Sequence, residues 1–246
     1  ISTNQFKFGG SSYDANNSNA ELRVSNSVLP SGATDFTIEG WIYLETLPSS
    51  GDSNSDSYIF VNQTGTTSNL QFLVHRDGGL RIIQKVSGTN VVNAEQGNLS
   101  GWSANTWYHV AATRSSNTWR VFRDGTLLGS DTYSGSNFLG TDDSWIGGKD
   151  NAAYLKGYLD EFRITSGVAR YTSNFTPQTA EFYPGTALGD ITSNSIDSFI
   201  RDPANISFNT TQPKSYEFTQ TTGSNKGIIT VSNEGSLPTL ADNYTI

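Results

Sequence analysis

The chain has 246 residues, a formal net charge of −8 at pH 7 and no cysteine. The lack of cysteine excludes disulfides, thiolate metal sites and a cysteine nucleophile. The acidic balance argues against a nucleic-acid partner, which needs a basic face, and no apolar run is long enough for a membrane-spanning helix. Thirteen Phe, eleven Tyr and five Trp supply the bulk of a hydrophobic core, so we expect a globular protein without membrane insertion.

Strand-forming residues alternate with Ser, Thr, Asn and Gly along the chain, which predicts short antiparallel strands. In chain order the predicted strands span Ala20–Val24, Phe36–Leu44, Tyr58–Val61, Leu70–His75, Leu80–Val86, Trp107–Arg114, Thr118–Arg123, Thr126–Gly129, Ser144–Gly148 and Gly157–Ile164. The run Phe36–Leu44 is apolar on nearly both faces and is therefore expected at the centre of a sheet. The pattern predicts an all-β protein, an antiparallel two-sheet sandwich.

Glycine-containing turns separate two pairs of these strands. Asp77-Gly78-Gly79 and Asp124-Gly125 are both hairpin signals, because glycine adopts positive φ without strain. Residues 184–195 change composition and predict a linker, followed by short β-like runs. These runs are Phe199–Ile200, Ile206–Phe208, Tyr216–Thr219, Gly227–Val231 and Tyr244–Ile246. We expect a sandwich over residues 1–183 and a smaller β-rich extension over residues 184–246, which would anchor or oligomerise the chain.

The predicted strand Gly157–Ile164 contains an acidic residue on its expected buried face. Strict alternation puts Tyr158, Asp160, Phe162 and Ile164 on one face, and the apolar members make this the buried face. A buried carboxylate is costly without partners, so Asp160 needs backbone donors, a cation or a metal. On the opposite face, Glu161 and Arg163 are expected to form a surface pair.

Several motifs, taken in order, resemble a laminin-G-like domain of the concanavalin A-like lectin/glucanase superfamily. They are FTIEGWIYL at Phe36–Leu44, WYHVA at Trp107–Ala111, RVFRDG at Arg120–Gly125 and WIGG at Trp145–Gly148. The resemblance covers about residues 5–182 and implies a jelly roll of two antiparallel sheets. The ending GVARYTSNFTP, residues 167–177, is similar to modules in tail-fibre and other virion structural proteins of bacteriophages, marine ones in particular. It departs from that variant at Gln178 and Glu181, where proline is common.

The resemblance also implies a structural calcium ion near the last core strand, where Asp160 matches the acidic position of the family. Backbone carbonyls of Gly9, Gly10, Tyr13 and Asp14 are the candidate partners. Calcium takes six to eight oxygen ligands, so one carboxylate is not sufficient. The alternative is that backbone N–H groups satisfy Asp160, and the sequence leaves both interpretations open.

No catalytic arrangement is visible in the sequence. The two histidines, His75 and His109, are expected to be structural, and neither a Ser-His-Asp arrangement nor metal-type histidine spacing occurs. Glucanases of this superfamily use closely spaced carboxylates on one strand. Here Asp142 and Asp143 lie in a predicted turn, so we expect a protein that is not an enzyme, with glycoside hydrolysis as a remote alternative.

Aromatic side chains are the candidates for stacking on sugar rings, provided that they are exposed. Trp41, Trp107 and Trp119 lie in predicted strands, and we expect Trp107 and Trp119 in the core. Trp102 and Tyr154 lie in loop-like segments and are the better candidates. Turn residues that could line the same rim are Arg76, Asp77, Lys149 and Asn151.

Together these features predict a non-enzymatic binding module on the surface of a virion. Such a module would be extracellular, resemble a tail-fibre or adhesin domain and recognise a glycan or protein of the host cell surface. Other virion proteins are the expected partners, in a homo-oligomer or larger assembly. The alternative is a purely structural decoration or fibre protein of the capsid or tail.

Overall fold

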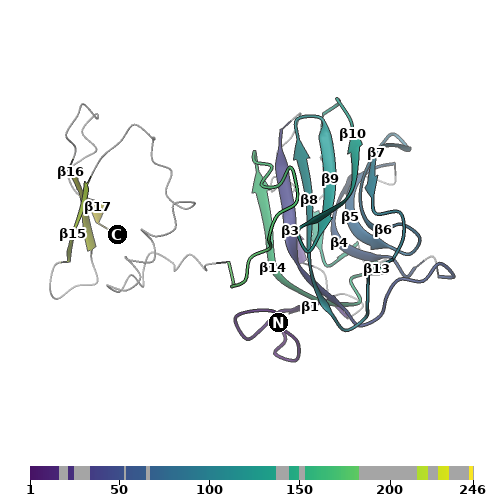
Figure 1. Ribbon diagram of the computed structural model, residues 1–246, viewed down its shortest axis with the longest axis horizontal. Helices are drawn as coiled ribbons and strands as arrows, with labels where there is room; N and C mark the ends of the chain where they lie inside the picture. Colours follow the sequence, from purple (N-terminus) through teal and green to yellow (C-terminus); the bar gives the residue numbers. More distant parts are fainter. Residues whose placement is uncertain are drawn as a thin grey trace. The chain divides into compact units, whose positions relative to one another are not determined.

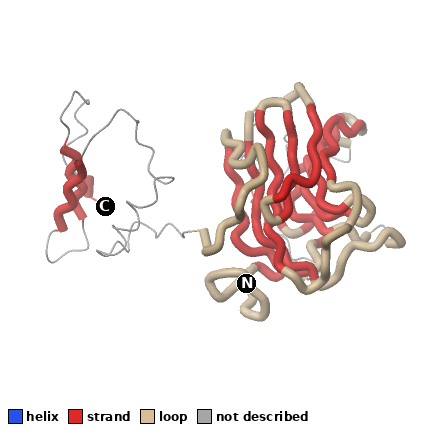
Figure 2. The backbone as a smooth tube through the Cα atoms, viewed as in Figure 1, coloured by secondary structure: helices blue, strands red, loops and turns tan. Residues whose placement is uncertain are grey.

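The computed structural model describes residues 1–16, 22–24, 34–52, 54–64, 67–136, 144–149, 153–182, 215–220, 227–232 and 244–245. The chain divides into two compact units, an N-terminal unit, Ile1–Phe182, and a C-terminal unit, Tyr183–Ile246. All regular structure in the described segments is β-structure, as Figure 2 shows. Within these segments no helix is long and apolar enough to cross a bilayer.

The N-terminal unit consists of two six-stranded antiparallel sheets, most of whose strands are labelled in Figure 1. The first sheet contains, in spatial order, β1 (Tyr13–Asp14), β14 (Gly157–Ser166), β3 (Phe36–Leu44), β8 (Trp107–Ser115), β9 (Thr118–Arg123) and β10 (Thr126–Thr132). The second contains β2 (Leu22–Val24), β11 (Ser144–Ile146), β4 (Ser57–Thr64), β5 (Ser68–His75), β6 (Gly79–Val86) and β7 (Thr89–Glu95). A short hairpin, β12 (Gly148–Lys149) and β13 (Ala153–Tyr154), follows β11. The predicted sandwich is therefore confirmed, with the jelly-roll architecture.

The hydrophobic core lies between the two sheets. In β3 the even-numbered residues Phe36, Ile38, Ile42 and Leu44 belong to it, each no more than 1% exposed. Successive side chains alternate across a strand, so the odd-numbered residues of β3 point to the opposite, outer face of the first sheet. These outward-facing residues of β3 are also buried, because other parts of the chain cover them.

Tight turns fix the register of the hairpins. At the β9–β10 turn both Asp124 (φ 48°) and Gly125 (φ 76°) have positive φ, as a type I′ turn requires. The hairpin of β6 and β7 turns in the same way at Ser87 and Gly88, which have φ values of 48° and 86°. Strand β7 was not among the predicted strands, although the Ser87-Gly88 dipeptide is a turn signal.

Strand β14 contains a β-bulge at Glu161. Asp160 lies opposite Trp41 of β3, whereas the next paired residue is Arg163, opposite Glu39. Glu161 has a φ of 49°, a left-handed conformation that is uncommon for a residue other than glycine. An extra residue in one strand changes which face the following side chains occupy.

The bulge corrects the predicted faces of β14. Leu159, which was expected on the solvent side, is 3% exposed and lies in the core, so its neighbours Tyr158 and Asp160 lie on the outer face. After the bulge, Phe162 and Ile164 pack against the core. The prediction that Tyr158, Asp160, Phe162 and Ile164 share one buried face is therefore wrong. Asp160 is still buried, at 8% exposure, but it is covered from outside the sheet.

Two segments cover the outer face of the first sheet, an arm of residues 1–12 and a strap of residues 167–182. Three hydrogen bonds fix the path of the strap. Thr37 of β3 donates to the carbonyl of Val168 (3.0 Å), and Thr113 of β8 donates to that of Tyr171 (2.9 Å). The N–H of Phe175 donates to the Gly125 carbonyl (2.9 Å) in the β9–β10 turn. Residues 168–175 of the strap thus cross the sheet from β3 over β8 to the β9–β10 turn.

The C-terminal unit contains a three-stranded antiparallel sheet of β15 (Ser215–Gln220), β16 (Gly227–Ser232) and β17 (Tyr244–Thr245). These strands coincide with three of the β-like runs expected there. The other two runs, Phe199–Ile200 and Ile206–Phe208, lie outside the described residues.

Candidate functional site

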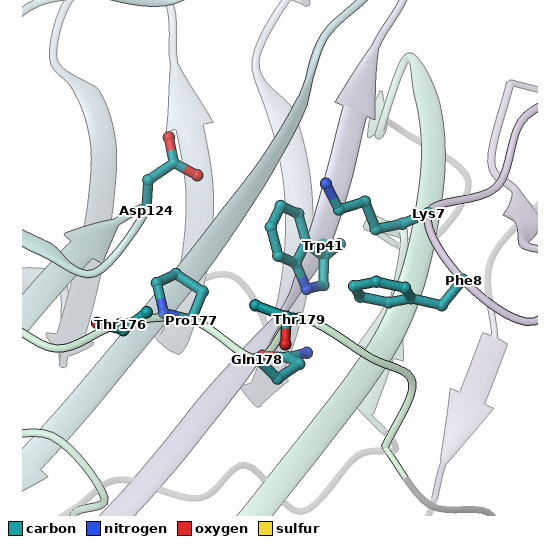
Figure 3. A pocket seen from close by; sticks show the side chains of 8 residues that line it. All are labelled: Lys7, Phe8, Trp41, Asp124, Thr176, Pro177, Gln178 and Thr179. Atoms are coloured by element: carbon teal, nitrogen blue, oxygen red, sulfur yellow. The ribbon is translucent and has the colours of Figure 1, made fainter.

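A pocket of about 370 Å³ lies on the outer face of the first sheet. Its floor is Trp41 of β3, and its walls come from the arm and the strap, as Figure 3 shows. The lining residues are Lys7, Phe8, Trp41, Asp124, Thr176, Pro177, Gln178 and Thr179. The volume is within the range of small-molecule sites, and the lining combines aromatic groups with a few polar ones. We call it the Trp41 pocket.

The indole of Trp41 is held in place by its neighbours. Its ring makes edge-to-face contacts with Phe8 (centroids 5.8 Å apart) and His109 (5.4 Å), and only 8% of the residue is exposed. The indole nitrogen Nε1 is buried, and no hydrogen-bond acceptor reaches it from the described part of the chain. A buried Trp N–H usually has a hydrogen-bond partner, so this one is an unsatisfied donor at the edge of the pocket.

The amide of Gln178 forms a second polar group of this kind. Both its Oε1 and Nε2 are buried, and neither has a hydrogen-bond partner among the described residues. In Figure 3 the nitrogen of Trp41 points to the side of the pocket where Gln178 and Thr179 lie. A buried polar group without a partner costs about 1–3 kcal/mol. Two such groups at one pocket are therefore a reason to expect a bound polar molecule.

The arm is fixed to the sheet by Asp160. Its Oδ2 accepts hydrogen bonds from the backbone N–H groups of Lys7 (2.7 Å) and Phe8 (3.0 Å), and its Oδ1 accepts one from the N–H of Glu161 (2.9 Å). Three N–H donors are sufficient to compensate a buried carboxylate. This geometry corresponds to the alternative in which backbone donors satisfy Asp160, and it positions two residues of the pocket wall.

Hydrogen bonds already engage the side chain named for calcium, Asp160. Both oxygens of Asp160 face N–H groups, whereas calcium requires six to eight oxygen ligands. Asp14 accepts a hydrogen bond from the N–H of Asn16 (3.0 Å), and Tyr13 pairs with Leu159 in the sheet. The turn residues Gly9 and Gly10 are exposed. No group of three or more acidic or histidine side chains suited to a metal occurs in the described segments.

Calcium is therefore expected to leave the thermal stability unchanged. A ligand that binds only the native state raises the melting temperature, so millimolar calcium, added after treatment with a chelator, should not shift it. A rise that disappears in the Asp160→Asn variant would contradict this expectation and would assign calcium to Asp160.

The strap is fixed by a buried carboxylate of β3, Glu39, which is 0% exposed. Its Oε1 accepts hydrogen bonds from Nε (3.0 Å) and Nη2 (2.7 Å) of Arg163, and its Oε2 accepts one from the hydroxyl of Tyr171 (2.7 Å). Nε2 of His109 lies 3.4 Å from Oε2, and Nε of Arg170 lies 3.8 Å from Oε1. Glu39 thus connects β3 to β8, β14 and the strap.

The pKa values of this group follow from its contacts. Burial raises the pKa of Glu39, but the contacts with His109, Arg163 and Tyr171 outweigh burial and hold the pKa below its ordinary value. Burial and the adjacent carboxylate raise the pKa of Tyr171. The expected surface pair of Glu161 and Arg163 is wrong, because Arg163 binds Glu39 and the carboxylate of Glu161 accepts a hydrogen bond from the N–H of Phe182.

His109 has a structural position beneath the strap, as expected. Its ring is fully buried between Trp41 and Phe175. The backbone N–H of His109 donates to Oδ1 of Asp124 (2.9 Å), and the backbone carbonyl of His109 accepts from the backbone N–H of Asp124 (2.8 Å). These bonds hold the Asp124 carboxylate at one end of the pocket.

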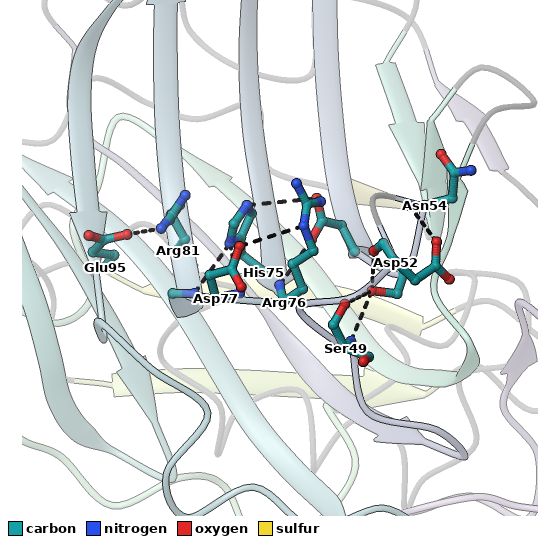
Figure 4. Close-up of polar contacts among 11 residues, drawn as sticks. Ser49, Asp52, Asn54, His75, Arg76, Asp77, Arg81 and Glu95 are labelled. Carbon is teal, nitrogen blue, oxygen red and sulfur yellow. Dashed lines mark hydrogen bonds and ion pairs between the residues drawn. The ribbon is translucent and has the colours of Figure 1, made fainter.

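Two of the predicted ligand residues, Arg76 and Asp77, belong to a separate polar network at the β5–β6 turn (Figure 4). The N–H and Nη1 of Arg76 both donate to the carboxylate of Asp56, each at 2.9 Å. Nδ1 of His75 accepts from the N–H groups of Asp77 (3.1 Å) and Gly78 (3.2 Å). Burial and the charge of a nearby arginine lower the pKa of His75, consistent with a neutral ring that accepts these bonds. The network stabilises the turn.

The other predicted ligand residues do not join the Trp41 pocket. Nζ of Lys149 lies 5.3 Å from the ring centre of Tyr58, and burial lowers the pKa of Lys149. Tyr154 is half-buried in β13. Trp102 is 6% exposed, lies in the core and donates from Nε1 to another side chain, so it lacks the exposure on which its candidacy depended. Asn151 lies outside the described residues.

Sequence reasoning missed most of the pocket. Lys7, Phe8 and the strap residues come from segments without periodicity, and only the folded chain brings them to Trp41. One signal was available, since Gln178 replaces a proline that is common in the resembling modules. A proline could not supply the amide that faces the pocket.

The observed architecture defines the class of protein. Two facing six-stranded antiparallel sheets enclose one aromatic and aliphatic core, which is a jelly-roll sandwich. The family model described as the concanavalin A-like lectin/glucanases superfamily matches residues 14–170. The chain belongs to this superfamily.

No curated protein sequence matches the chain. Among solved structures, domain 4 of AbnA, a GH43 extracellular arabinanase from Geobacillus stearothermophilus in complex with arabinotriose, has a TM-score of 0.49 and 19% identity over 65% of this chain and 77% of its own. Domains LG4–5 of the mouse laminin α1 chain have a TM-score of 0.46 and 15% identity, over 64% of this chain and 40% of theirs. A sialidase CBM40 from Ruminococcus gnavus, bound to sialyllactose, has a TM-score of 0.42 and 12% identity, over 58% and 86%.

Proposed function

We propose that the N-terminal unit is a non-enzymatic carbohydrate-binding module and that the Trp41 pocket is its ligand site. One observation carries the proposal: two buried polar groups without partners, the indole N–H of Trp41 and the amide of Gln178, meet at one pocket beside aromatic rings. A sugar offers both hydroxyl groups for such polar atoms and C–H faces for aromatic rings. Membership of a lectin and glucanase superfamily supports this ligand class.

The chemistry of the pocket supports binding without catalysis. Glycoside hydrolases of the common type need two carboxyl groups, about 5–5.5 or 6.5–9.5 Å apart. The described lining of the Trp41 pocket supplies one carboxylate, Asp124, and its Oδ1 already accepts a hydrogen bond from the N–H of His109. The Trp41 pocket is therefore proposed to bind a sugar without cleaving it, and glycoside hydrolysis remains the remote alternative.

We further propose that the module is displayed on the outside of a virion, in a tail-fibre or adhesin-like protein that contacts the host cell. The strap sequence GVARYTSNFTP supports this proposal through its resemblance to phage modules. In this arrangement the C-terminal unit anchors or oligomerises the chain with other virion proteins. A purely structural decoration or fibre role is the rival, and it predicts assembly without glycan binding.

A glycan array tests the proposed function. We expect the full chain to bind at least one class of glycan, and we expect the Trp41→Phe variant to bind it roughly tenfold more weakly. Phenylalanine keeps an aromatic ring but removes the N–H, and one hydrogen bond contributes about 0.5–1.5 kcal/mol. Trp107→Phe is the matched control, because Trp107 lies on the same face of the sheet but not among the pocket residues. Absence of any bound glycan, or full binding by Trp41→Phe, would reject the proposal.

A further inference from the structure

We infer that the ligand of the Trp41 pocket is an anionic sugar residue, one that carries a carboxylate or a sulfate, and that Lys7 binds its negative group. This inference rests on the proposed function and specifies the ligand class. It starts from a contrast in charge, because a chain with a net charge of −8 places a lysine ammonium at its candidate site.

The ammonium of Lys7 has no counter-ion in the described part of the chain. Its Nζ lies 4.0 Å from the ring centre of Trp41 and 5.7 Å from that of Phe8, while no carboxylate oxygen lies within ion-pair distance among the described residues. Aromatic faces attract a cation, but they do not supply an oxygen acceptor for any of its three N–H donors. The ammonium therefore retains donors for an oxygen in the pocket.

The backbone of Lys7 is fixed, which makes its side chain a prepared binding group. Its N–H donates to Oδ2 of Asp160 at 2.7 Å, and the next residue, Phe8, is held by the same oxygen. The residue itself is half-buried. Less conformational freedom is lost when a ligand binds a group that is already held in position.

Three donor groups and one carboxylate line the pocket, and the carboxylate lies on a different side from Lys7 (Figure 3). Lys7 Nζ, Trp41 Nε1 and Gln178 Nε2 are three donors, the last two without partners among the residues described. Figure 3 shows Asp124 on the side of the pocket away from Lys7 and Phe8. A carboxylate or sulfate near Lys7 gains charge-assisted hydrogen bonds, whereas sugar hydroxyls can donate to Asp124. The pocket thus matches a ligand with one anionic end and one hydroxyl-bearing end.

The test compares anionic and neutral glycans on the full chain. An array that carries neutral, carboxylate-bearing and sulfated glycans is expected to give signals for an anionic class. Isothermal titration with an oligogalacturonate trimer, its carboxyl-reduced neutral counterpart and a sulfated galactose trimer then separates the two sources of charge. For the anionic trimer that binds, Lys7→Gln should weaken affinity about tenfold or more and reduce its dependence on salt. Lys156→Gln is the matched control, since it removes the same charge from a lysine outside the pocket whose side chain is 41% exposed.

Each outcome decides the inference. Preference for an anionic class together with the loss in Lys7→Gln supports it, and the trimers identify carboxylate or sulfate as the group. Binding of neutral glycans alone, lost in Trp41→Phe but unchanged in Lys7→Gln, overturns the anionic ligand and leaves the proposed function intact. If no glycan binds, both fail. Equal losses in Lys7→Gln and Lys156→Gln would attribute the effect to net charge and overturn the role of Lys7.

Discussion

Replacement of Glu39 by glutamine is expected to reduce the free energy of unfolding by about 3 kcal/mol, roughly 10 °C in melting temperature. Removing one partner from a buried ion pair typically costs 3–5 kcal/mol because the other charge is left uncompensated. Here the partners Arg163 and Arg170 keep 30% and 32% of their side chains exposed. Solvent reduces the penalty, so the low end of the range applies.

The same change should alter the dependence of stability on pH. The pKa of Glu39 lies below its ordinary value of 4.5 in the folded protein. Its ionised form therefore stabilises the fold above about pH 4.5, and this contribution is lost as the pH falls from there through the lower folded pKa. The difference in unfolding free energy between wild type and Glu39→Gln should be constant above pH 4.5 and become smaller below it.

Urea denaturation at several pH values measures both effects. Asp77→Asn is a suitable control, because Asp77 is 55% exposed and its neutralisation should change stability by less than about 1 kcal/mol. A Glu39→Gln variant as stable as wild type at pH 7 would mean that the carboxylate does not hold the strap. A difference that grew with acidity would contradict the direction of the pKa.

Replacement of Asp160 by alanine is expected to destabilise the fold by about 3 kcal/mol and to weaken glycan binding. Three backbone N–H groups lose their acceptor, and hydrogen bonds to charged groups contribute about 1.5–3 kcal/mol each. The sum is reduced because the N–H groups of the exposed arm can turn to water. Without this acceptor, Lys7 and Phe8 no longer hold their positions in the pocket wall.

Hydrogen exchange separates the local effect from global unfolding. In Asp160→Ala the amides of Lys7 and Phe8 should exchange much faster than in wild type, under conditions where β3 stays protected. Asp14→Ala is the matched control, since Asp14 lies in neighbouring β1 and its carboxylate accepts from the N–H of exposed Asn16. Unchanged protection of the two arm amides would show that Asp160 does not hold the arm.

The sheets could be predicted where local signals are strong. The bounds of Phe36–Leu44 agree with the sequence prediction, because a continuous apolar run has no alternative in a central strand. The Asp124-Gly125 turn was predicted from its dipeptide, because Asp-Gly favours the positive φ values that both positions adopt. Strand β7, Thr89–Glu95, carries only a few buried apolar residues and was missed.

The bulge and the pocket could not be predicted, because they depend on contacts between distant parts of the chain. Nothing local to Glu161 indicates a positive φ, so strict alternation assigned Leu159 and Asp160 to the wrong faces. The bond from the Lys7 N–H to Asp160 joins residues 153 apart in sequence. Trp41 was a candidate ligand residue only if it was exposed. Its exposure depends on the arm and the strap, and neither segment has a periodic pattern that sequence reasoning could use.

The residues of the Trp41 pocket lie partly inside and partly outside the region that the superfamily model matches. Its floor residue Trp41 and its end residue Asp124 lie inside the region that the superfamily model matches, residues 14–170. Lys7, Phe8 and the strap residues 176–179 all lie outside that region. On the proposed function, these two segments of the chain carry most of the residues that would contact the ligand. An exchange of the two short segments would therefore alter recognition, while the sandwich beneath them keeps its packing.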